Sequence, residues 1–145
     1  MNVSEIRTKL INNKDDRLKA FCSMTIDNDF VVRDIKIIEG TGGYFVAMPS
    51  RKMTDHCERC SGKNHLRAKF CNNCGAALPE SRVYKDVKGR MKLHADIAHP
   101  VNAECRQTIQ QTIVKFFTEE LEKAKQPDYK PVEMDDPDDD VSERN

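Results

Sequence analysis

In the first third of the chain, turn-forming residues separate short segments of apolar and polar residues, a pattern that is typical of β-strands. Three segments (3–11, 18–26 and 30–38) mix β-branched and polar residues, and a short apolar run follows at 44–48. Clusters of Asn, Asp and Gly separate them and favour turns, because these residues tolerate a positive φ. The pattern predicts an antiparallel meander, although segment 30–38 also fits part of a helical pattern.

Further along, the spacing of apolar residues changes to that of a helix. One apolar stripe recurs at intervals of three and four residues and consists of Cys105, Ile109, Ile113, Phe116, Phe117 and Leu121. Asn102 is a suitable N-cap, and Gln126-Pro127 ends the pattern. We expect this helix to pack its stripe on the sheet. The fold class is therefore α+β, a small antiparallel sheet with a C-terminal helix.

Segment 53–93 has no long apolar run, so it cannot build a core from side chains alone. It therefore needs a cross-link, such as a bound metal ion, to fold. We assign residues 1–52 and 94–125 to one α+β domain, with 53–93 inserted in a loop. Residues 126–145 combine three prolines with eight acidic side chains, which predicts a disordered acidic tail.

The inserted segment contains a strong metal-binding motif. Cys57, Cys60, Cys71 and Cys74 have the spacing C-x2-C-x10-C-x2-C, which suits the tetrahedral four-thiolate shell that zinc prefers. A complete thiolate shell leaves no open coordination position, so we expect one structural zinc ion per chain. His56 or His65 replacing one sulfur, and a redox role for the cysteine pairs, are the alternatives. Gly75, and in the same way Gly62, suit turns that need a positive φ.

The two remaining cysteines lie in apolar patterns. Cys22 belongs to a strand-like segment and Cys105 to the apolar stripe of the helix. Free cysteine is often buried as a small apolar residue, so both are expected in the core. A redox-sensing role is the alternative.

The formal net charge of zero conceals two oppositely charged regions. Residues 126–145 carry eight acidic and two basic side chains, a net of −6, and the other 125 residues carry a net of +6. A basic body suggests a polyanion partner, DNA or RNA. The candidate contacts in and beside the insertion are Arg51, Lys52, Arg59, Lys63, Arg67 and Lys69. The alternatives are an ordinary lysine-rich surface and a tail that only aids solubility.

Several classes of protein are disfavoured by the sequence. No catalytic motif such as G-x-S-x-G, H-E-x-x-H or a glycine-rich phosphate loop with a lysine is present, so we expect no enzyme activity and no small-molecule substrate. The sequence contains no stretch of 18 apolar residues that could span a membrane, and we find no export signal before the predicted strands. Six cysteines without such a signal suggest a reduced compartment, the cytoplasm.

Two blocks outside the insertion resemble the stage V sporulation protein G family of septation regulators. The first is FVVRDIKIIEG with GYFVAMPSR, residues 30–40 and 43–51; the second is DIAHPVN, residues 96–102, followed by Arg106 and Ile109-Gln110. The N-terminal strands match more loosely. The resemblance covers residues 1–52 and 96–125, and the insertion takes the place of a short loop of the family.

The resemblance implies a homodimer formed through strand pairing and a DNA- or RNA-binding regulator with contacts in the helix region. Arg106 corresponds to an arginine at the start of the family's helix. We expect it in the first turns, on the face opposite Ile109 and Ile113. Two residues depart from the family: Arg33 replaces a common histidine, and Thr108 replaces a common lysine. The rival hypothesis is a protein-interaction adaptor in which the inserted segment 53–93, which we expect to form a zinc ribbon, and the acidic tail dock a partner protein.

Overall fold

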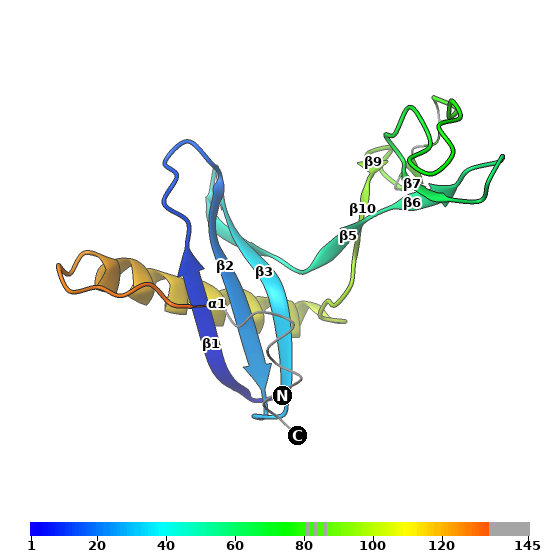
Figure 1. Ribbon diagram of the computed structural model, residues 1–145. Coiled ribbons are helices and arrows are strands. Elements are labelled where there is room, and N and C mark those ends of the chain that lie inside the picture. The colour runs from blue at the N-terminus through cyan, green and yellow to red at the C-terminus, as the bar shows by residue number, and fades with distance from the viewer. Residues whose placement is uncertain (81, 83, 86, 134–145) are drawn as a thin grey trace, which may run out of the picture. The chain divides into compact units, whose positions relative to one another are not determined.

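The computed structural model describes residues 1–80, 82, 84, 85 and 87–133 (Figure 1). The expected tail therefore lies mostly outside the described residues. The chain divides into two compact units. The first comprises Met1–Pro49 together with the chain from Ala98 onward, and the second comprises Ser50–Ile97.

The first unit contains a four-stranded antiparallel sheet. Its strands are β1 (Val3–Leu10), β2 (Leu18–Ile26), β3 (Phe30–Gly40) and β4 (Gly43–Ala47), and they lie side by side in chain order. The predicted antiparallel sheet is confirmed. The helical alternative for segment 30–38 is wrong, because this segment is the third strand of the sheet.

A β-bulge in β3 changes which residues face the core. The register between β2 and β3 shifts between Cys22 and Met24, and Asp34 opposite this shift has a φ of 58°. Val32 and Ile35 are three residues apart, yet both are buried in the same apolar cluster. A regular strand would place them on opposite faces, so the extra bulge residue is what brings both into the core.

The helix α1 (Ala103–Ala124) packs on one face of this sheet (Figure 1). Its N-cap is Asn102, as predicted, and the Oδ1 atom of Asn102 accepts a hydrogen bond from the Cys105 amide at 2.7 Å. The buried helix residues are Ile109, Ile113 and Phe117, and the sheet contributes Ala20, Cys22, Met24, Val32, Ile35 and Ile37.

The prediction for Phe116 was wrong, since its side chain is 40% exposed. Adjacent helical residues point about 100° apart, so Phe116 and Phe117 cannot both face the sheet. Phe117 takes the core position, and its ring meets that of Tyr44 edge-on with centroids 4.8 Å apart.

The outer edge of β4 is covered by a helix side chain. Gln110 accepts a hydrogen bond at Oε1 from the Val46 amide (2.8 Å) and donates from Nε2 to the Tyr44 carbonyl (3.0 Å). The side-chain amide thus occupies two backbone groups that another strand would otherwise use. The strand at the other edge of the sheet is β1.

The second unit is built from three short antiparallel pairs. They are β5 (Ser50–Lys52) with β10 (His94–Asp96), β6 (Thr54–His56) with β7 (Lys63–His65), and β8 (Tyr84–Lys85) with β9 (Met91–Lys92). The sequence predicted that residues 50–52 and 94–96, which form β5 and β10, belong to the α+β domain. Their pairing with each other places both in the second unit instead.

Buried apolar residues are few in the second unit. Those in its described part are Cys57, Leu66 and Cys71. Two of these three are cysteines of the motif, so a bound metal would sit where the unit has its core. Among the described residues of the chain, no helix is long and apolar enough to cross a membrane.

Candidate metal centre and nucleic-acid interface

The first cysteine pair lies in a tight turn that follows β6. The Ser61 amide donates to the Cys57 carbonyl at 2.8 Å, and the Cys57 amide donates to the Gly62 carbonyl at 2.8 Å. These bonds close the turn around Glu58 and Arg59. Both cysteine side chains of the turn are therefore held on the same side.

The second cysteine pair repeats this arrangement. The Gly75 amide donates to the Cys71 carbonyl at 3.0 Å, and the Cys71 amide donates to the Ala76 carbonyl at 2.8 Å. The two turns, which we call knuckles, thus share one backbone design at equivalent positions. The repeat explains why two identical cysteine spacings occur in the sequence.

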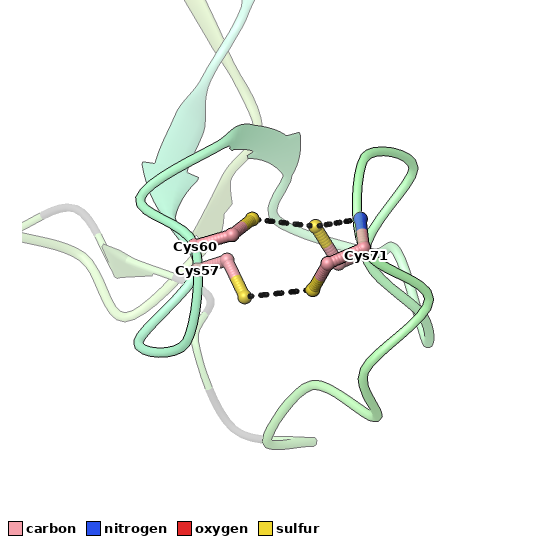
Figure 2. Close-up of side chains that lie close together, drawn as sticks. Cys57, Cys60 and Cys71 are labelled. Atoms are coloured by element: carbon pink, nitrogen blue, oxygen red, sulfur yellow. Dashed lines mark hydrogen bonds between the residues drawn. The ribbon is translucent and has the colours of Figure 1, made fainter.

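The four sulfur atoms converge on one point (Figure 2). All of them lie within 4.8 Å of one another, with 3.8 Å between Cys57 and Cys74 and 3.5 Å between Cys60 and Cys71. Four thiolates at about 2.3 Å from a central tetrahedral ion would be about 3.8 Å apart. The four cysteines can therefore hold a metal ion after small shifts of their side chains.

Backbone amides of the knuckles donate to the sulfurs. The Gly62 amide donates to Cys60 Sγ at 3.4 Å, and the Asn73 and Cys74 amides donate to Cys71 Sγ at 3.4 and 3.5 Å. Hydrogen bonds to a thiolate stabilise its charged form. The amide of Cys74, the side chain of Asn64 and the amide of Asn73 lower the pKa of Cys71 to about 6. The Asn73 side chain and the Gly62 amide also lower the pKa of Cys60.

Asn64 joins the two knuckles from inside the unit. Its side chain is buried; Nδ2 donates to the Gly62 carbonyl (3.1 Å) and to Cys71 Sγ (3.4 Å), and Oδ1 accepts from the Asn72 amide (2.9 Å). One amide thus ties a carbonyl of the first knuckle to a ligand atom of the second. No local sequence signal singles out Asn64, because only the folded hairpin of β6 and β7 carries it between the knuckles.

The two glycines of the motif have different roles. Gly75 has a φ of 77°, which confirms the prediction that its turn needs a positive φ. The equivalent residue of the first knuckle is Ser61, with a φ of 62°, so the prediction for Gly62 was wrong. Gly62 is instead constrained by space, because a Cβ atom there would lie 3.1 Å from Asn73 Cβ and 3.3 Å from Cys60 Sγ.

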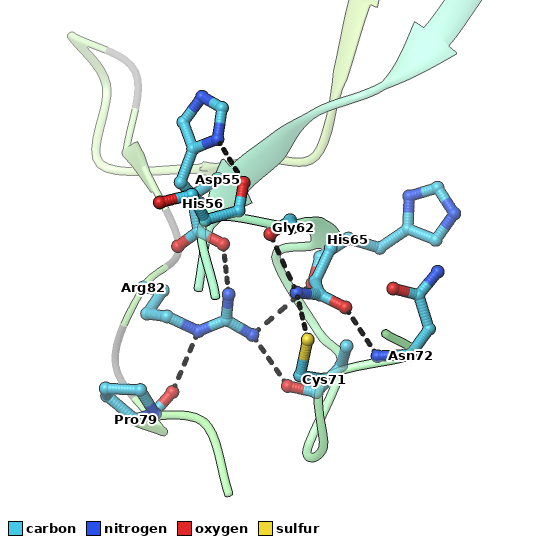
Figure 3. Close-up of polar contacts among 11 residues, drawn as sticks. Asp55, His56, Gly62, His65, Cys71, Asn72, Pro79 and Arg82 are labelled. Atoms are coloured by element: carbon cyan, nitrogen blue, oxygen red, sulfur yellow. Dashed lines mark hydrogen bonds and ion pairs between the residues drawn. The ribbon is translucent and has the colours of Figure 1, made fainter. Parts of the chain in front are cut away.

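Arg82 connects distant parts of the second unit (Figure 3). Its guanidinium forms an ion pair with Asp55 and donates to the carbonyls of Ala68 (2.6 Å), His65 (3.3 Å) and Pro79 (3.0 Å). The side chain is only 10% exposed. A guanidinium with several satisfied donors serves the fold rather than an external anion.

The sequence left open whether a histidine such as His56 replaces a sulfur of the cluster, and what role Cys22 and Cys105 have. The cluster that could hold a metal comprises the four cysteines, and His56 Nδ1 lies 3.0 Å from the Ser61 carbonyl instead. Cys22 is fully buried, as predicted, and burial raises its pKa to about 11. Cys105 is half-buried against the same core.

All seven basic residues singled out from the sequence are exposed. Six lie in the second unit: Arg51 and Lys52 on β5, Arg59 in the first knuckle, Lys63 on β7, and Arg67 and Lys69 between the knuckles. Arg106 lies in the first unit. None of the seven has a side-chain ion pair with another described residue. Their charges are therefore available at the surface.

The expected position of Arg106 on the helix needs a correction. Arg106 precedes Ile113 by seven residues, close to two turns of about 3.6 residues each, so the two share one side of the helix. The Arg106 side chain is nevertheless exposed in the first turn. Its neighbourhood is not purely basic, because Glu104 stands in the same turn.

Comparisons with known proteins place the chain among related sequences. The sequence profile of the SpoVG family matches residues 1–119. A protein of Finegoldia magna with the name "Putative septation protein SpoVG" is 33% identical over 132 residues, which is 91% of this chain and 88% of the relative. Proteins of the same name from Bdellovibrio bacteriovorus and Caldanaerobacter subterraneus are each 36% identical, over 121 and 126 residues. These alignments cover 83% and 87% of this chain, and 77% and 93% of the relatives.

Proposed function

The chain belongs to the SpoVG family, and from this premise we propose that it is a nucleic-acid-binding regulator of the septation and sporulation type that carries a structural zinc ribbon. The observation that carries the proposal is the set of seven exposed basic side chains without ion-pair partners among the described residues. The family is named for septation rather than for a chemical reaction, which supports a non-catalytic role.

Zinc is the metal that best suits the four-cysteine cluster. The sulfur spacing, the complete set of four thiolates and the amide donors all suit a tetrahedral ion that prefers sulfur. When bound, such an ion supplies a cross-link rather than a reactive water, because no ligand position remains open. Cys57, Cys60, Cys71 and Cys74 would hold it. The reduced cytoplasm is the compartment in which these thiols stay available.

The charge of the second unit supports a polyanionic partner. Residues 50–97 contain eleven basic and five acidic side chains, a net of +6. Zinc with four thiolates contributes a charge of −2, which leaves the unit at about +4. Exposed cations of this number bind phosphates through release of counterions, so the affinity falls as salt increases.

The test compares two full-length variants that lose the same charge. One replaces Arg59, Lys63, Arg67 and Lys69 with Gln; the control replaces Lys14, Lys115, Lys123 and Lys125, which are exposed in the other unit. Mobility shifts of labelled DNA and RNA across a salt series should show weakened binding only for the first variant. Failure of the parent chain to bind either nucleic acid at low salt would refute the proposed function.

We further propose a homodimer formed through strand pairing, as the family resemblance implies. Gln110 occupies backbone groups on the outer edge of β4, so the unpaired edge of β1 is the better partner strand. Pairing there would also hide that edge from aggregation. Sedimentation at micromolar concentration should show a dimer, and a monomer would contradict this proposal.

A protein-interaction adaptor is the second candidate function, favoured by one feature of the second unit. Phe70 is 65% exposed and borders a cavity of about 470 Å³ that Leu66, Leu78 and Pro79 also line. An exposed apolar ring beside a cavity suits a protein partner. This candidate replaces the first if the parent chain binds no nucleic acid.

A further inference from the structure

On the face of the sheet opposite α1, two exposed lysines flank a half-buried phenylalanine. Lys9 of β1 pairs with Phe21 of β2, Phe21 pairs with Lys36 of β3, and Lys36 pairs with Ala47 of β4. These four residues form one continuous row across the sheet, with neighbouring strands about 4.8 Å apart. The row contains two cations and no carboxylate.

The position of this row follows from the alternation of the strands. Ala20 and Cys22 flank Phe21 and are fully buried in the core on the helix side. Successive side chains of a strand point to opposite faces, so Phe21 lies on the other face. Lys9 and Lys36 are exposed, and neither has an ion pair with another described residue.

A further aromatic and a further basic side chain lie next to the row on the same face. Phe45 pairs with Ile38 and lies two residues before Ala47 on β4, so it shares the same face of the sheet. It is 43% exposed. Neither Phe21 nor Phe45 belongs to the buried core cluster. Arg7 lies beside Lys9 on this face and pairs with Glu5 at 3.0 Å. The core therefore does not account for the two phenylalanines.

We propose that this sheet face binds single-stranded nucleic acid, with a base stacked on Phe21 and the flanking phosphates on Lys9 and Lys36. An aromatic ring accepts any base by stacking, and cations on both sides follow the backbone of the strand. A second copy of the sheet would bring the lysine rows against one another, which disfavours stacking of two sheets. Stacking on a protein side chain needs a base whose ring face is free, which an unpaired strand offers and a duplex does not, so this surface suits a single strand.

This inference deepens the proposed function and rests on it. It names a second binding surface, in the first unit, besides the basic residues of the ribbon. The two surfaces can be tested separately, because they share no residue. Lys9 and Lys36 were not among the contacts that the sequence suggested, since only the strand register brings them to either side of Phe21.

The first test removes the two lysine charges from the full-length protein. Lys9→Gln with Lys36→Gln should weaken binding of a labelled single-stranded oligonucleotide, RNA or DNA, by about tenfold or more at low salt. The slope of log affinity against log salt should fall by about 1.4, which corresponds to two phosphates on a single strand. The control is Lys14→Gln with Lys115→Gln, two exposed lysines outside the row, and should bind like the parent.

The second test examines stacking. An oligonucleotide with 2-aminopurine should lose fluorescence on binding the parent; Phe21→Leu should abolish this quenching and weaken binding about tenfold, and Phe21→Tyr should restore both. Thermal melting of each variant reports whether the sheet is intact. If Phe21→Leu melts like the parent and still quenches, the stacking site is refuted.

The two proposals fail in different ways. If the parent binds single strands but the Lys9 and Lys36 variant binds equally well, this surface is refuted and the proposed function stands. Equal weakening for a duplex of the same sequence would refute the preference for single strands. If the parent binds no nucleic acid at low salt, the proposed function itself fails.

Discussion

Asn64 donates a hydrogen bond to the sulfur of Cys71 across 3.4 Å while the same amide group donates to the Gly62 carbonyl of the other knuckle. A single buried side chain therefore fixes the distance between the two halves of the metal centre. The four cysteines are the candidate ligands, but their relative placement depends on Asn64, which is not one of them. This relationship makes the geometry of the site sensitive to one amide.

Replacement of Asn64 by Leu should lower the affinity for zinc by about 10- to 100-fold, the usual effect of losing a partner that orients a ligand. Leu has a similar size but leaves the Asn72 amide without its acceptor, while the Gly62 carbonyl keeps only its bond from the Cys57 amide. Competition with a chromophoric chelator measures the change. Asn72→Leu is the matched control, because the exposed Asn72 takes part only through its backbone amide. Equal affinities for the two variants would contradict the orienting role.

One equivalent of zinc per chain is expected in protein purified without oxygen, and Cys71→Ser should reduce it to nearly none. The second unit has few buried apolar residues, so its hydrogen-exchange protection should disappear with the metal. The sheet of the first unit should keep its protection. Cys105→Ser removes a thiol outside the cluster and should keep the metal. Parent protein with much less than one equivalent would rule out the zinc site.

Acidification should weaken zinc binding further as the pH falls below about 6, because Cys71 must then lose a proton before its thiolate can bind the metal. The Cys74 amide, Asn64 and the Asn73 amide depress the pKa of Cys71 from 9.0 to about 6. A depressed pKa in the folded state gives a stabilising contribution that is complete above 9.0 and lost as the pH falls through the folded value. Asn64→Leu should therefore release metal at a higher pH than the parent, as followed by chelator absorbance. Release of both at the same pH would contradict the prediction.

Arg106→Ala should weaken nucleic-acid binding and reduce its salt dependence by about one phosphate contact. The side chain is exposed, so the midpoint of thermal unfolding should hardly change. Titrations of labelled DNA and RNA at several salt concentrations measure the effect. Lys115→Ala, an exposed change later in the same helix, is the control. Binding equal to that of the parent would move the interface away from the start of the helix.

Removal of residues 134–145 should raise the affinity for nucleic acid. This segment contains six acidic side chains and one arginine and lies outside the described residues, and its charge can compete for the basic surfaces. Truncation there spares Tyr129, which donates to Glu120 at 2.6 Å. The gain should be largest at low salt, where screening is weakest. An affinity unchanged at every salt concentration would leave the tail with a solubilising role only.

The sequence alone predicted the local elements and the metal ligands. Segments of β-branched and polar residues between turn residues identified the strands, and Asn102 with the stripe from Cys105 to Leu121 identified the helix, because each of these signals depends on residues close in the chain. The C-x2-C spacing identified the four cysteines that cluster in the structure for the same reason, since a knuckle is a local turn. The error at Phe116 arose because two adjacent aromatic residues compete for one core position.

Only the tertiary structure decided how distant segments meet. The bulge at Asp34 brings Val32 and Ile35 to one face, and the register places Phe21 between Lys9 and Lys36. Pairing of β5 with β10 assigns both strands to the ribbon unit. Asn64 and Gln110 carry no local signal either, because each bonds to backbone groups whose positions depend on the whole fold. Patterns within a few residues are readable from the chain, but contacts between remote residues require the register and packing of the folded protein.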